Sequence, residues 1–470
     1  MSKEILSIND FSTWIINDDT VTTNKGFADV SWLDIYTEEW VAQPNVKPLA
    51  ETTPWIDLIN GYVDFDGRVV WWWDNEEIWY NNTWTTWTLL NTNTNAWDND
   101  DLVVYQNYLI YASDSKLWRS TTTTIAWGFT DNPTWGSGSD FLNWTSTDIH
   151  IFKIFNNRLY VTDWNVLAEL DWASDPTTPT NWVFTQDKFK LPEWEIIQSL
   201  EIVWGQLALW TADGNLYIWD GSSSNSSAII PTKWWGITAM IQLENTLFVY
   251  AWVDWTIYRY NGADLVPVIQ IPDVITSSSW TFVQHNWVKR YRNGIIFGLS
   301  LNWLYVFNRV KEWDSFSLVK YWNLSVWQSI KDDQIDVSAL HVIPWKVVSW
   351  DTIFISYNDS INAIDRVTNT NGLYDDAFLE TVDYELRNNN WQATKVQGVQ
   401  LKFKQLISWT ITVKYKTDYN NTFTTLWTID HVWFTSNSKE LILRWIWLRV
   451  DKIIFRFEWL NWKLINIKIF

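Results

Sequence analysis

The chain has 470 residues, no cysteine and a formal net charge of −20. Without cysteine it forms no disulfide, uses no thiol in catalysis and builds no cysteine-based zinc site. The acidic balance argues against binding to nucleic acid or to an anionic membrane surface, because both require a basic protein surface. No long apolar run occurs anywhere, and no apolar core follows Met1, so we expect neither membrane insertion nor a secretory signal.

The first 58 residues differ in pattern from those that follow. Lys25–Leu49 combines an apolar run with two prolines, Pro44 and Pro48. Proline lacks a backbone donor and favours an extended or turn conformation. We therefore predict that residues 1–58 form an extended N-terminal arm with short strands.

A hairpin unit repeats between residues 59 and 372. In its clearest copy, Ile196–Gly221, apolar residues alternate on both sides of Asp213-Gly214, which is a strong hairpin signal. Copies begin near residues 61, 102, 150, 198, 240, 288 and 338, so their spacing is 41 to 50 residues. A period in the forties with several strands per repeat is typical of propeller blades. We predict an all-β fold with a β-propeller of about seven blades over residues 59–372.

From residue 373 the pattern changes to longer strands. Apolar and polar residues alternate through Thr394–Lys404, Thr410–Lys416, Leu441–Phe457 and Leu464–Phe470. Several such strands in succession are typical of a β-sandwich or jelly roll. Residues 373–470 are therefore predicted to form a C-terminal, jelly-roll-like β-sandwich.

Tryptophan stands at positions where a turn requires glycine. The chain has 42 tryptophans and only 15 glycines, although tight turns need a residue that accepts positive φ. Trp164, Trp255 and Trp303 occupy the glycine position of Asp-Gly or Asn-Gly turns. We hypothesise that many tryptophans stand for UGA codons, which some bacterial lineages read as glycine, whereas Trp87 and Trp219 at strand positions are genuine. The alternative is that the tryptophans form a carbohydrate-stacking surface.

Two segments resemble known proteins. With glycine in place of Trp32 and Trp40, Lys25–Leu49 resembles the opening of a broad group of tailed-phage virion proteins, in which an N-terminal segment precedes a propeller. The C-terminal strands resemble the sandwich of the same proteins at Lys395, Gly398, Leu401, Phe403, Val413, Tyr415, Thr417 and Asp418. The resemblance implies a structural component of the tail tip, baseplate or fibre attachment. Such a protein docks with other virion proteins and with copies of itself, and it is assembled in the host bacterial cytoplasm.

The sequence carries no pattern typical of catalysis. The four histidines share no metal-ligand spacing; they are His150, His285, His341 and His431. Two acidic loops, Asp98–Asp101 and Asp332–Asp336, offer the oxygen ligands that Ca²⁺ prefers, but solvated acidic loops are expected in so acidic a chain. We predict no catalytic residue, no cofactor site and no metal site, and therefore no enzyme.

One turn resembles the Asp-box of sialidase-like propellers. Tyr80–Trp87 matches it in part, with Asn82 at the Asp position, Trp84 at the Gly position, and Thr86 and Trp87 as the closing pair. Such turns lock hairpins in many unrelated propellers, so a structural role is favoured. Two other functions stay open: a glycan-binding adhesin or receptor-binding protein, whose partner would be a host-surface glycan, and a sialidase-like glycosidase. The latter needs two carboxylates that face one another across a cleft.

Overall fold

The computed structural model confirms the predicted all-β class. It describes residues 6–8, 27–31, 33–34, 43–51, 59–73, 77–81, 87–92, 101–113, 116–120, 123–125, 150–172, 182–231, 237–251, 256–271, 284–298, 303–308, 316–323, 336–343, 352–358, 363–368, 371, 377–381, 384–385, 394–404, 410–417, 419–430, 440–450, 452–460 and 463–469. The regular elements within these ranges are strands, apart from a short 3-10 helix, η2 (Gln284–Trp287). Among them, no helix is long and apolar enough to cross a membrane.

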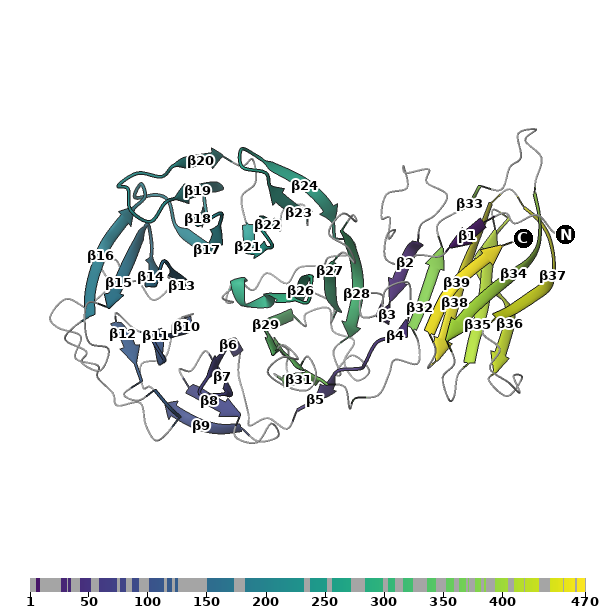
Figure 1. Ribbon diagram of the computed structural model, residues 1–470, viewed down its shortest axis with the longest axis horizontal. Helices are drawn as coiled ribbons and strands as arrows, with labels where there is room; N and C mark the ends of the chain where they lie inside the picture. The colour runs from purple at the N-terminus through teal and green to yellow at the C-terminus, as the bar shows by residue number, and fades with distance from the viewer. Residues whose placement is uncertain are drawn as a thin grey trace.

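Groups of antiparallel strands follow one another around a ring (Figure 1). The first group has β6 (Ile59–Phe65), β7 (Arg68–Trp73), β8 (Glu77–Asn81) and β9 (Trp87–Thr92). The second has β10 (Leu102–Tyr105), β11 (Tyr108–Ser113) and β12 (Lys116–Arg119). The third has β13 (Phe152–Phe155), β14 (Arg158–Asp163), β15 (Val166–Trp172) and β16 (Trp182–Lys190). The fourth has β17 (Ile197–Val203), β18 (Gln206–Thr211), β19 (Asn215–Trp219) and β20 (Ala228–Pro231).

The ring continues with three further groups. The fifth has β21 (Ile237–Leu243), β22 (Thr246–Ala251), β23 (Thr256–Tyr260) and β24 (Leu265–Gln270). The sixth has β25 (Val288–Tyr291), β26 (Gly294–Gly298), β27 (Trp303–Asn308) and β28 (Ser317–Asn323). The seventh joins β29 (Asp336–Ile343), β30 (Thr352–Asn358) and β31 (Ala363–Val367) to β5 (Leu49–Ala50), a strand from near the start of the chain.

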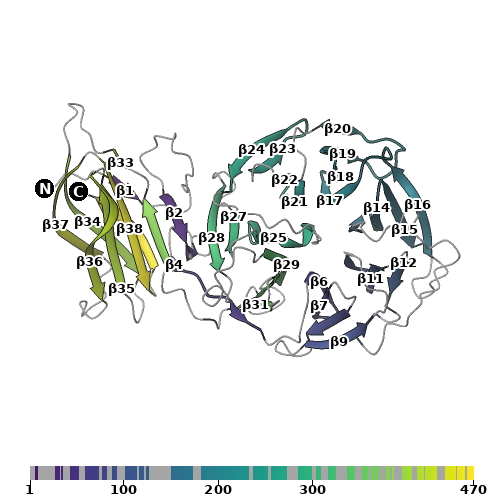
Figure 2. The same ribbon diagram turned by 180° about the vertical axis from the view of Figure 1, so that it is seen from behind.

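The first strand of each group lies at the centre of the ring, and we call these seven the inner strands: β6, β10, β13, β17, β21, β25 and β29. Each inner strand contacts the next one around the ring, and β29 contacts β6. The circle of inner strands is thus closed, with the later strands of each group placed progressively outward (Figures 1 and 2).

The inner strands share a sequence pattern of two apolar residues that enclose two more exposed ones. The last residue of the pattern is buried in every inner strand; these residues are Phe65, Tyr105, Phe155, Val203, Leu243, Tyr291 and Ile343. The residue three positions earlier is also buried; these residues are Tyr62, Leu102, Phe152, Leu200, Met240, Val288 and Leu340. The two buried residues anchor each strand between its neighbours, while the middle pair is less buried.

A tight turn follows most inner strands. Its first residue has φ between 49° and 54° in six groups; these residues are Asp66, Gln106, Asn156, Trp204, Glu244 and Arg292. The following residue also has positive φ at Gly67, Asn107, Asn157 and Gly205. Two successive residues with positive φ are typical of type I′ turns, whose twist matches that of the flanking strands. We call the face of the ring that carries these turns the turn face.

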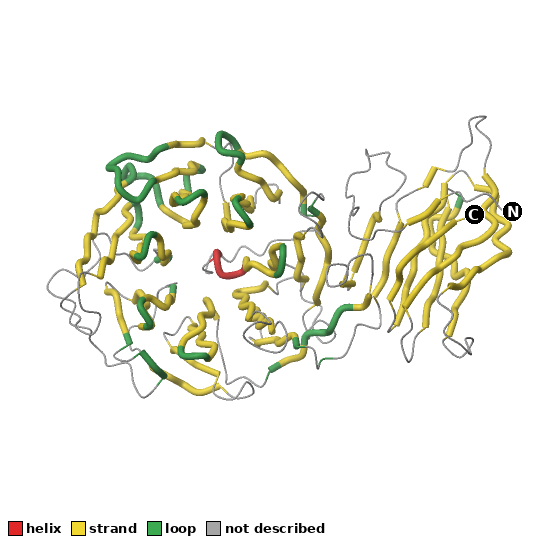
Figure 3. The backbone as a smooth tube through the Cα atoms, viewed as in Figure 1, coloured by secondary structure: helices red, strands yellow, loops and turns green. Residues whose placement is uncertain are grey.

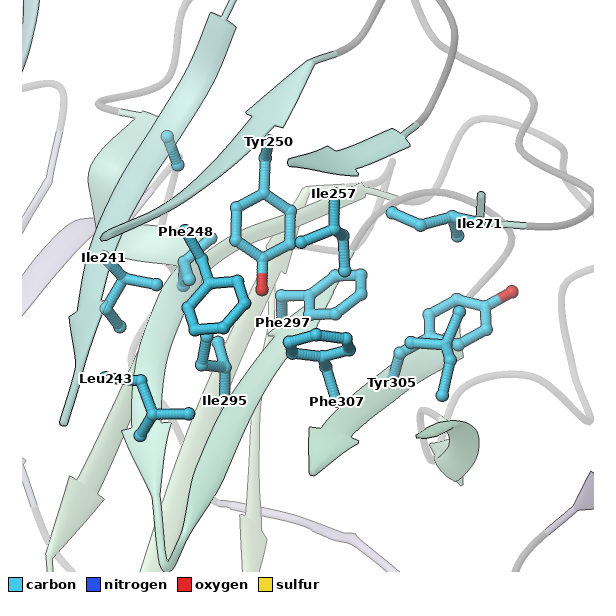
Figure 4. Packing of buried hydrophobic residues seen from close by; sticks show 13 residues of the cluster. Ile241, Leu243, Phe248, Tyr250, Ile257, Ile271, Ile295, Phe297, Tyr305 and Phe307 are labelled. Atoms are coloured by element: carbon cyan, nitrogen blue, oxygen red, sulfur yellow. The ribbon is translucent and has the colours of Figure 1, made fainter. Parts of the chain in front are cut away.

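Aromatic side chains fill the space between neighbouring groups. Between the fifth and sixth groups, Phe248 and Phe307 meet edge to face with ring centroids 5.2 Å apart, and Tyr250 meets Phe297 at 4.9 Å (Figure 4). Offset and edge-to-face contacts of this kind add to the stabilisation that burial provides. The core is therefore a series of layers between groups and not one central cluster.

A second body contains the C-terminal strands. One sheet has the order β1 (Leu6–Ile8), β39 (Lys463–Ile469), β34 (Thr394–Lys404) and β37 (Glu440–Val450). The other has β2 (Phe27–Ser31), β32 (Ala377–Thr381), β38 (Lys452–Leu460), β35 (Thr410–Thr417) and β36 (Asn420–Asp430), with β33 (Tyr384–Glu385) also paired to β38. Burial alternates along β35 and β38, so this sheet buries one face. The short strands β3 (Leu33–Asp34) and β4 (Gln43–Pro44) pair with each other.

One sheet runs from the ring into this second body. β28, the outermost strand of the sixth group, pairs in parallel with β2 through Ser31 and Lys320, and β2 pairs with β32. The two bodies therefore share a ten-stranded sheet.

Of the three tryptophans predicted at glycine positions of turns, one lies in a turn, one lies in a strand and one is not described. Trp164 lies between β14 and β15 with φ of 56°, as expected for a glycine position. Trp303 is instead the first residue of β27, opposite Asn323, so its predicted turn position is wrong. Pairing with β28 extends the strand back to this residue. Trp255 lies outside the described residues.

Candidate functional site

Three of the four histidines lie within the described residues, each on a different segment of the ring. His150 is fully buried, with Nε2 3.8 Å from Oδ1 of Asp163. Nε2 of His341 on β29 lies 2.8 Å from Oδ1 of Asp64 on the neighbouring inner strand β6. His285 belongs to η2, and His431 lies outside the described residues. Within the described ranges, no three histidine or acidic side chains are grouped as metal ligands would be.

The acidic loops and the Asp-box segment fall largely outside the described residues. Asp101 is described and buried, and its carboxylate accepts from the backbone N–H groups of Leu102 (2.8 Å) and Phe152 (3.1 Å). It therefore joins the second group to the third. Asp336 begins β29, and Trp87 begins β9 with its side chain in the core beside Trp71.

Two buried glutamates hold neighbouring strands together within their groups. Glu195 accepts hydrogen bonds from the Thr211 hydroxyl, from Nδ2 of Asn215 (2.5 Å) and from the Tyr217 hydroxyl (3.0 Å). Burial and this carboxylate raise the pKa of Tyr217 to about 12. Every one of these partners belongs to the fourth group, so Glu195 joins the segment before β17 to β18 and β19.

Glu169 on β15 plays a similar role in the third group. Its carboxylate accepts from the Tyr160 hydroxyl (2.9 Å) and pairs with Arg158 (2.5 Å) and Lys188 (3.2 Å). The donors come from β14 and β16, on either side of β15. Two cations and a hydroxyl therefore hold this carboxylate between β14 and β16.

The middle pairs of the inner strands bring charged and polar side chains to the ring axis. Lys153 on β13 pairs with Glu201 on β17 at 2.8 Å. Arg290 on β25 donates to Oε1 of Gln242 on β21 at 3.3 Å. Together with the contact between His341 and Asp64, these interactions join neighbouring inner strands around the axis. In the second group, by contrast, the middle pair is Val103 and Val104.

The short helix η2 lies inside the circle of inner strands (Figure 3). It precedes β25 and contacts β6, β21 and β29 as well. Nδ2 of Asn286 in η2 donates to the backbone carbonyl of Asn60 on β6 at 3.0 Å. Gly61 permits this approach, because a Cβ atom there would lie 2.8 Å from Nδ2 of Asn286 and would overlap the ring of Trp72.

Lys289 is the most perturbed cation at the axis. Its Nζ donates to Oδ1 of Asn286 at 3.1 Å. The pKa of Lys289 is lowered to about 8, chiefly by burial; the charge of Asp101 opposes this shift, that of Lys153 adds to it, and that of Glu201 opposes it. The sequence analysis considered only histidines and acidic residues as candidate site residues and therefore did not include Lys289. The pattern that could have identified it is Val288–Tyr291, in which Lys289 and Arg290 take the two middle positions that are valine in the second group.

The outer rim exposes apolar side chains on two neighbouring groups. Ile229 on β20 is 55% exposed, and Val266 and Val268 on β24 are each 37% exposed. Pro231 and Pro267 lie in the same two strands. Proline limits backbone pairing at a sheet edge, so contacts here would rest on side chains.

The exposed aromatic residues of the described chain are dispersed. Trp194 precedes β17, Trp204 lies on the turn face, and Tyr419 lies in the C-terminal body. Trp204 packs against Tyr260 with ring centroids 5.2 Å apart, and its indole donates to the carbonyl of Asn245 at 2.5 Å. These positions do not form one stacking surface in the part of the chain that is described.

Comparison with known proteins gives similarity in structure alone. No family model and no curated protein matches the sequence. Among solved structures, the chain is similar to the β-propeller domain of Cps50 (Swd1) from Myceliophteria thermophila, with 12% identity, a TM-score of 0.43 and coverage of 68% of this chain and 100% of that one. It is also similar to the WD40 domain of Neurospora crassa Pan2, with 9% identity, a TM-score of 0.44 and coverage of 68% and 94%. The WD40 β-propeller domain of Doa1 has 8% identity, a TM-score of 0.44 and coverage of 68% and 97%.

Proposed function

We propose that this chain is a seven-bladed β-propeller followed by a C-terminal β-sandwich, and that it is a structural component of a tailed-phage virion. The supporting observation is the ten-stranded sheet that β28, β2 and β32 make continuous between ring and second body. Hydrogen-bonded strands resist relative motion of the two bodies. A protein whose two bodies keep a fixed orientation is suited to docking at a tail tip, baseplate or fibre attachment, because neighbouring virion proteins then meet it in one geometry.

The arm supports the same proposal. Within residues 1–58, β1 pairs in the second body and β5 pairs in the ring. Glu51, beside β5, forms an ion pair with Arg366 on β31, and Nδ2 of Asn371 donates to the carbonyl of Lys47 at 2.7 Å. In the proposed organisation, 1–58 is an arm that fastens a propeller (59–372) to a sandwich (373–470).

The partners in this proposal are other virion proteins and copies of the chain. We assign such contacts to the exposed apolar side chains of β20 and β24. Covering them with a partner protein removes apolar surface from water, which is favourable. The protein would act without catalysis, in the virion, after assembly in the host bacterial cytoplasm.

The direct test is the composition of tailed virions purified from an infected culture of the host. We expect peptides of this chain in amounts that match other tail proteins, and labelling of the tail by an antibody against the chain. A chain that is produced during infection but absent from washed virions would contradict the proposal.

The two alternatives have separate tests. A glycan-binding adhesin has one observation in its favour, the 72% exposure of Trp194, and would bind specific glycans on an array. A sialidase-like glycosidase would release sialic acid from a chromogenic substrate. If the isolated protein binds a glycan and Trp194→Ala abolishes that binding, the result would favour the adhesin over a docking role.

We also propose that some tryptophans, including Trp164, are glycine in the protein as its own host makes it. Trp164-Asn165 occupies the same hairpin position in the third group as Gly214-Asn215 in the fourth, and both residues at the first position have positive φ, 56° and 84°. Buried indoles give further support. The Nε1 groups of Trp71, Trp210 and Trp322 are enclosed, and no described atom accepts their hydrogen bonds, which is unfavourable for a buried donor. The Nε1 group of Trp87 is likewise enclosed without an acceptor among the described atoms.

Trp164→Gly should therefore stabilise the recombinant protein, by about 1 kcal/mol, because a side chain in the left-handed region is strained. The loss of the 3.2 Å hydrogen bond from its indole to the carbonyl of Glu193 is small at this exposed site. Chemical denaturation measures the change.

Trp303→Gly is the matched control, since Trp303 lies in a strand, where glycine is unfavourable. We expect this variant to be less stable than the parent. Equal effects of the two substitutions would contradict the glycine assignment, as would a native peptide with tryptophan at position 164.

A further inference from the structure

Exposed apolar side chains gather on the outer rim of the ring. Nine large apolar side chains are exposed in the described part of the chain, and five of them lie on the outermost strand of a group. These five are Leu49, Leu89, Ile229, Val266 and Val268. Single exposed apolar residues are normal on a protein surface, whereas exposed apolar residues that gather on one feature mark an interaction surface.

The five residues fall on two pairs of neighbouring groups, on opposite sides of the ring. The first rim patch has Ile229 on β20 and both valines, Val266 and Val268, on β24, in the fourth and fifth groups. The second rim patch has Leu49 on β5 and Leu89 on β9, in the seventh and first groups. In Figure 1 the strands of the first patch lie at the top of the ring and those of the second at the bottom.

The outer strands that carry the two patches contain no charged residue; they are β5, β9, β20 and β24. The outer strand of the third group is different, because β16 includes Asp187, Lys188 and Lys190. Charged side chains on an outer strand protect it from association. In a chain with a net charge of −20, two copies repel one another, so uncharged strands are where a second copy meets the least repulsion.

The sixth group shows that the rim can receive a strand from outside the ring. Its outer strand β28 pairs with β2 of the second body through Lys320 and Ser31. This covered strand lies between the two rim patches, since the fifth group precedes it and the seventh follows it. The patches therefore continue, on either side, a rim that the chain itself covers at one place.

We propose that the first rim patch of one copy binds the second rim patch of the next copy, head to tail. Charge favours this arrangement over contact between two first patches, because Asp220 before β20 and Asp264 before β24 are exposed and would meet like charges. The second patch instead brings Lys47, two residues before Leu49. Such a contact covers both patches with one kind of partner, and it closes into a ring or continues as a filament. The inference rests on the proposed function only in taking a copy of the chain as the partner.

The first experiment measures self-association of the full chain by light scattering and sedimentation over a range of concentrations. We expect assemblies to grow with concentration. Ile229→Asp and Leu89→Asp should each weaken association by at least about 10-fold, because each contact loses the burial of a large apolar side chain. Tyr419→Asp is the matched control, since Tyr419 is 76% exposed but lies in the second body. A parent chain that stays monomeric at every concentration would overturn the proposal.

Circular dichroism shows whether each variant is folded. If Ile229→Asp does not fold, Val268→Asp replaces it, and Leu49→Asp replaces Leu89→Asp in the same way, because each substitute is exposed on the same patch. Loss of association in Tyr419→Asp equal to that in the rim variants would assign the contact to another surface.

The second experiment tests the head-to-tail arrangement by mixing, at a concentration where neither rim variant associates alone. In an equal mixture, the intact second patch of Ile229→Asp can bind the intact first patch of Leu89→Asp. We therefore expect dimers in the mixture and nothing larger. Association of Leu89→Asp alone to the same extent as the parent would mean that first patches bind each other, and a mixture without dimers would also contradict the proposal.

These results are separate from the test of the virion role. A chain that is present in washed virions but monomeric in solution would end this inference and leave the proposed function intact. A chain that associates through the rim patches but is absent from virions would have the opposite meaning.

Discussion

Trp219→Ala should lower the free energy of unfolding by about 3–5 kcal/mol, the usual range for truncating a buried large aromatic side chain. Trp219 is fully buried at the end of β19. Its ring stacks on Phe189 with centroids 5.0 Å apart and meets Tyr160 edge to face at 5.7 Å. Its indole donates to the carbonyl of Ser223 at 2.7 Å. The substitution removes these two ring contacts between the third and fourth groups and leaves a cavity.

Trp194→Ala is the control for this prediction. Trp194 is 72% exposed and lies one residue before Glu195, and exposed substitutions usually change stability by less than about 0.5 kcal/mol. Denaturant titration followed by circular dichroism measures both variants. If Trp219→Ala were as mild as Trp194→Ala, then Trp219 would not be the well-packed, genuine tryptophan that the strand position and these contacts indicate.

Glu195→Ala should have the second large effect, a loss of about 1–3 kcal/mol for each buried polar partner that is left without an acceptor. The substitution leaves the Thr211 hydroxyl, the Asn215 amide and the Tyr217 hydroxyl without their common acceptor. Glu195→Gln should lose less, because the amide keeps one oxygen acceptor. Glu193→Ala, at an exposed position in the same loop, should be close to neutral.

The hydrogen bond between Tyr217 and Glu195 also predicts that stability depends on pH in the alkaline range. The pKa of Tyr217 is raised from 10.0 to about 12, first by burial and then by Glu195. A raised folded-state pKa gives a stability contribution that is complete below pH 10 and is lost as pH rises toward 12. In Glu195→Ala the hydroxyl should ionise at lower pH, which ultraviolet absorbance detects. An unchanged titration would show that Glu195 does not control Tyr217.

Local pattern was sufficient for most strands of the ring. The alternation in β18 and β19, with Asp213-Gly214 between them, predicted both strands and their turn. The repeat spacing then predicted successive groups of strands. These features depend on residues close together in sequence, which is why a single sequence reveals them. Trp303 was misplaced because an isolated Asn-Trp pair was interpreted as a turn without regard to the strand residues that follow it.

The long-range features could not be predicted from local pattern. Asn286 and Asn60 meet across the axis although 226 residues separate them, and β5 pairs with a strand more than 300 residues later. Nothing in the sequence around Leu49–Ala50 distinguishes a ring strand from any other extended segment. The two cations were visible as Lys289-Arg290, but the carboxylates that act on Lys289, Asp101 and Glu201, lie in other groups of the ring.

The pairing of both chain ends in one sheet has a consequence for synthesis. Leu6 pairs with Ile469, and Phe27 pairs with Thr381, so β1 and β2 leave the ribosome long before their partners exist. The intervening ring can form most of its sheets from consecutive strands as translation proceeds, whereas the second body must wait for the last residues. During that interval the first strands have unpaired edges, which favour aggregation. Synthesis of the C-terminal strands, not ring formation, would then set the time at which β1 and β2 become paired.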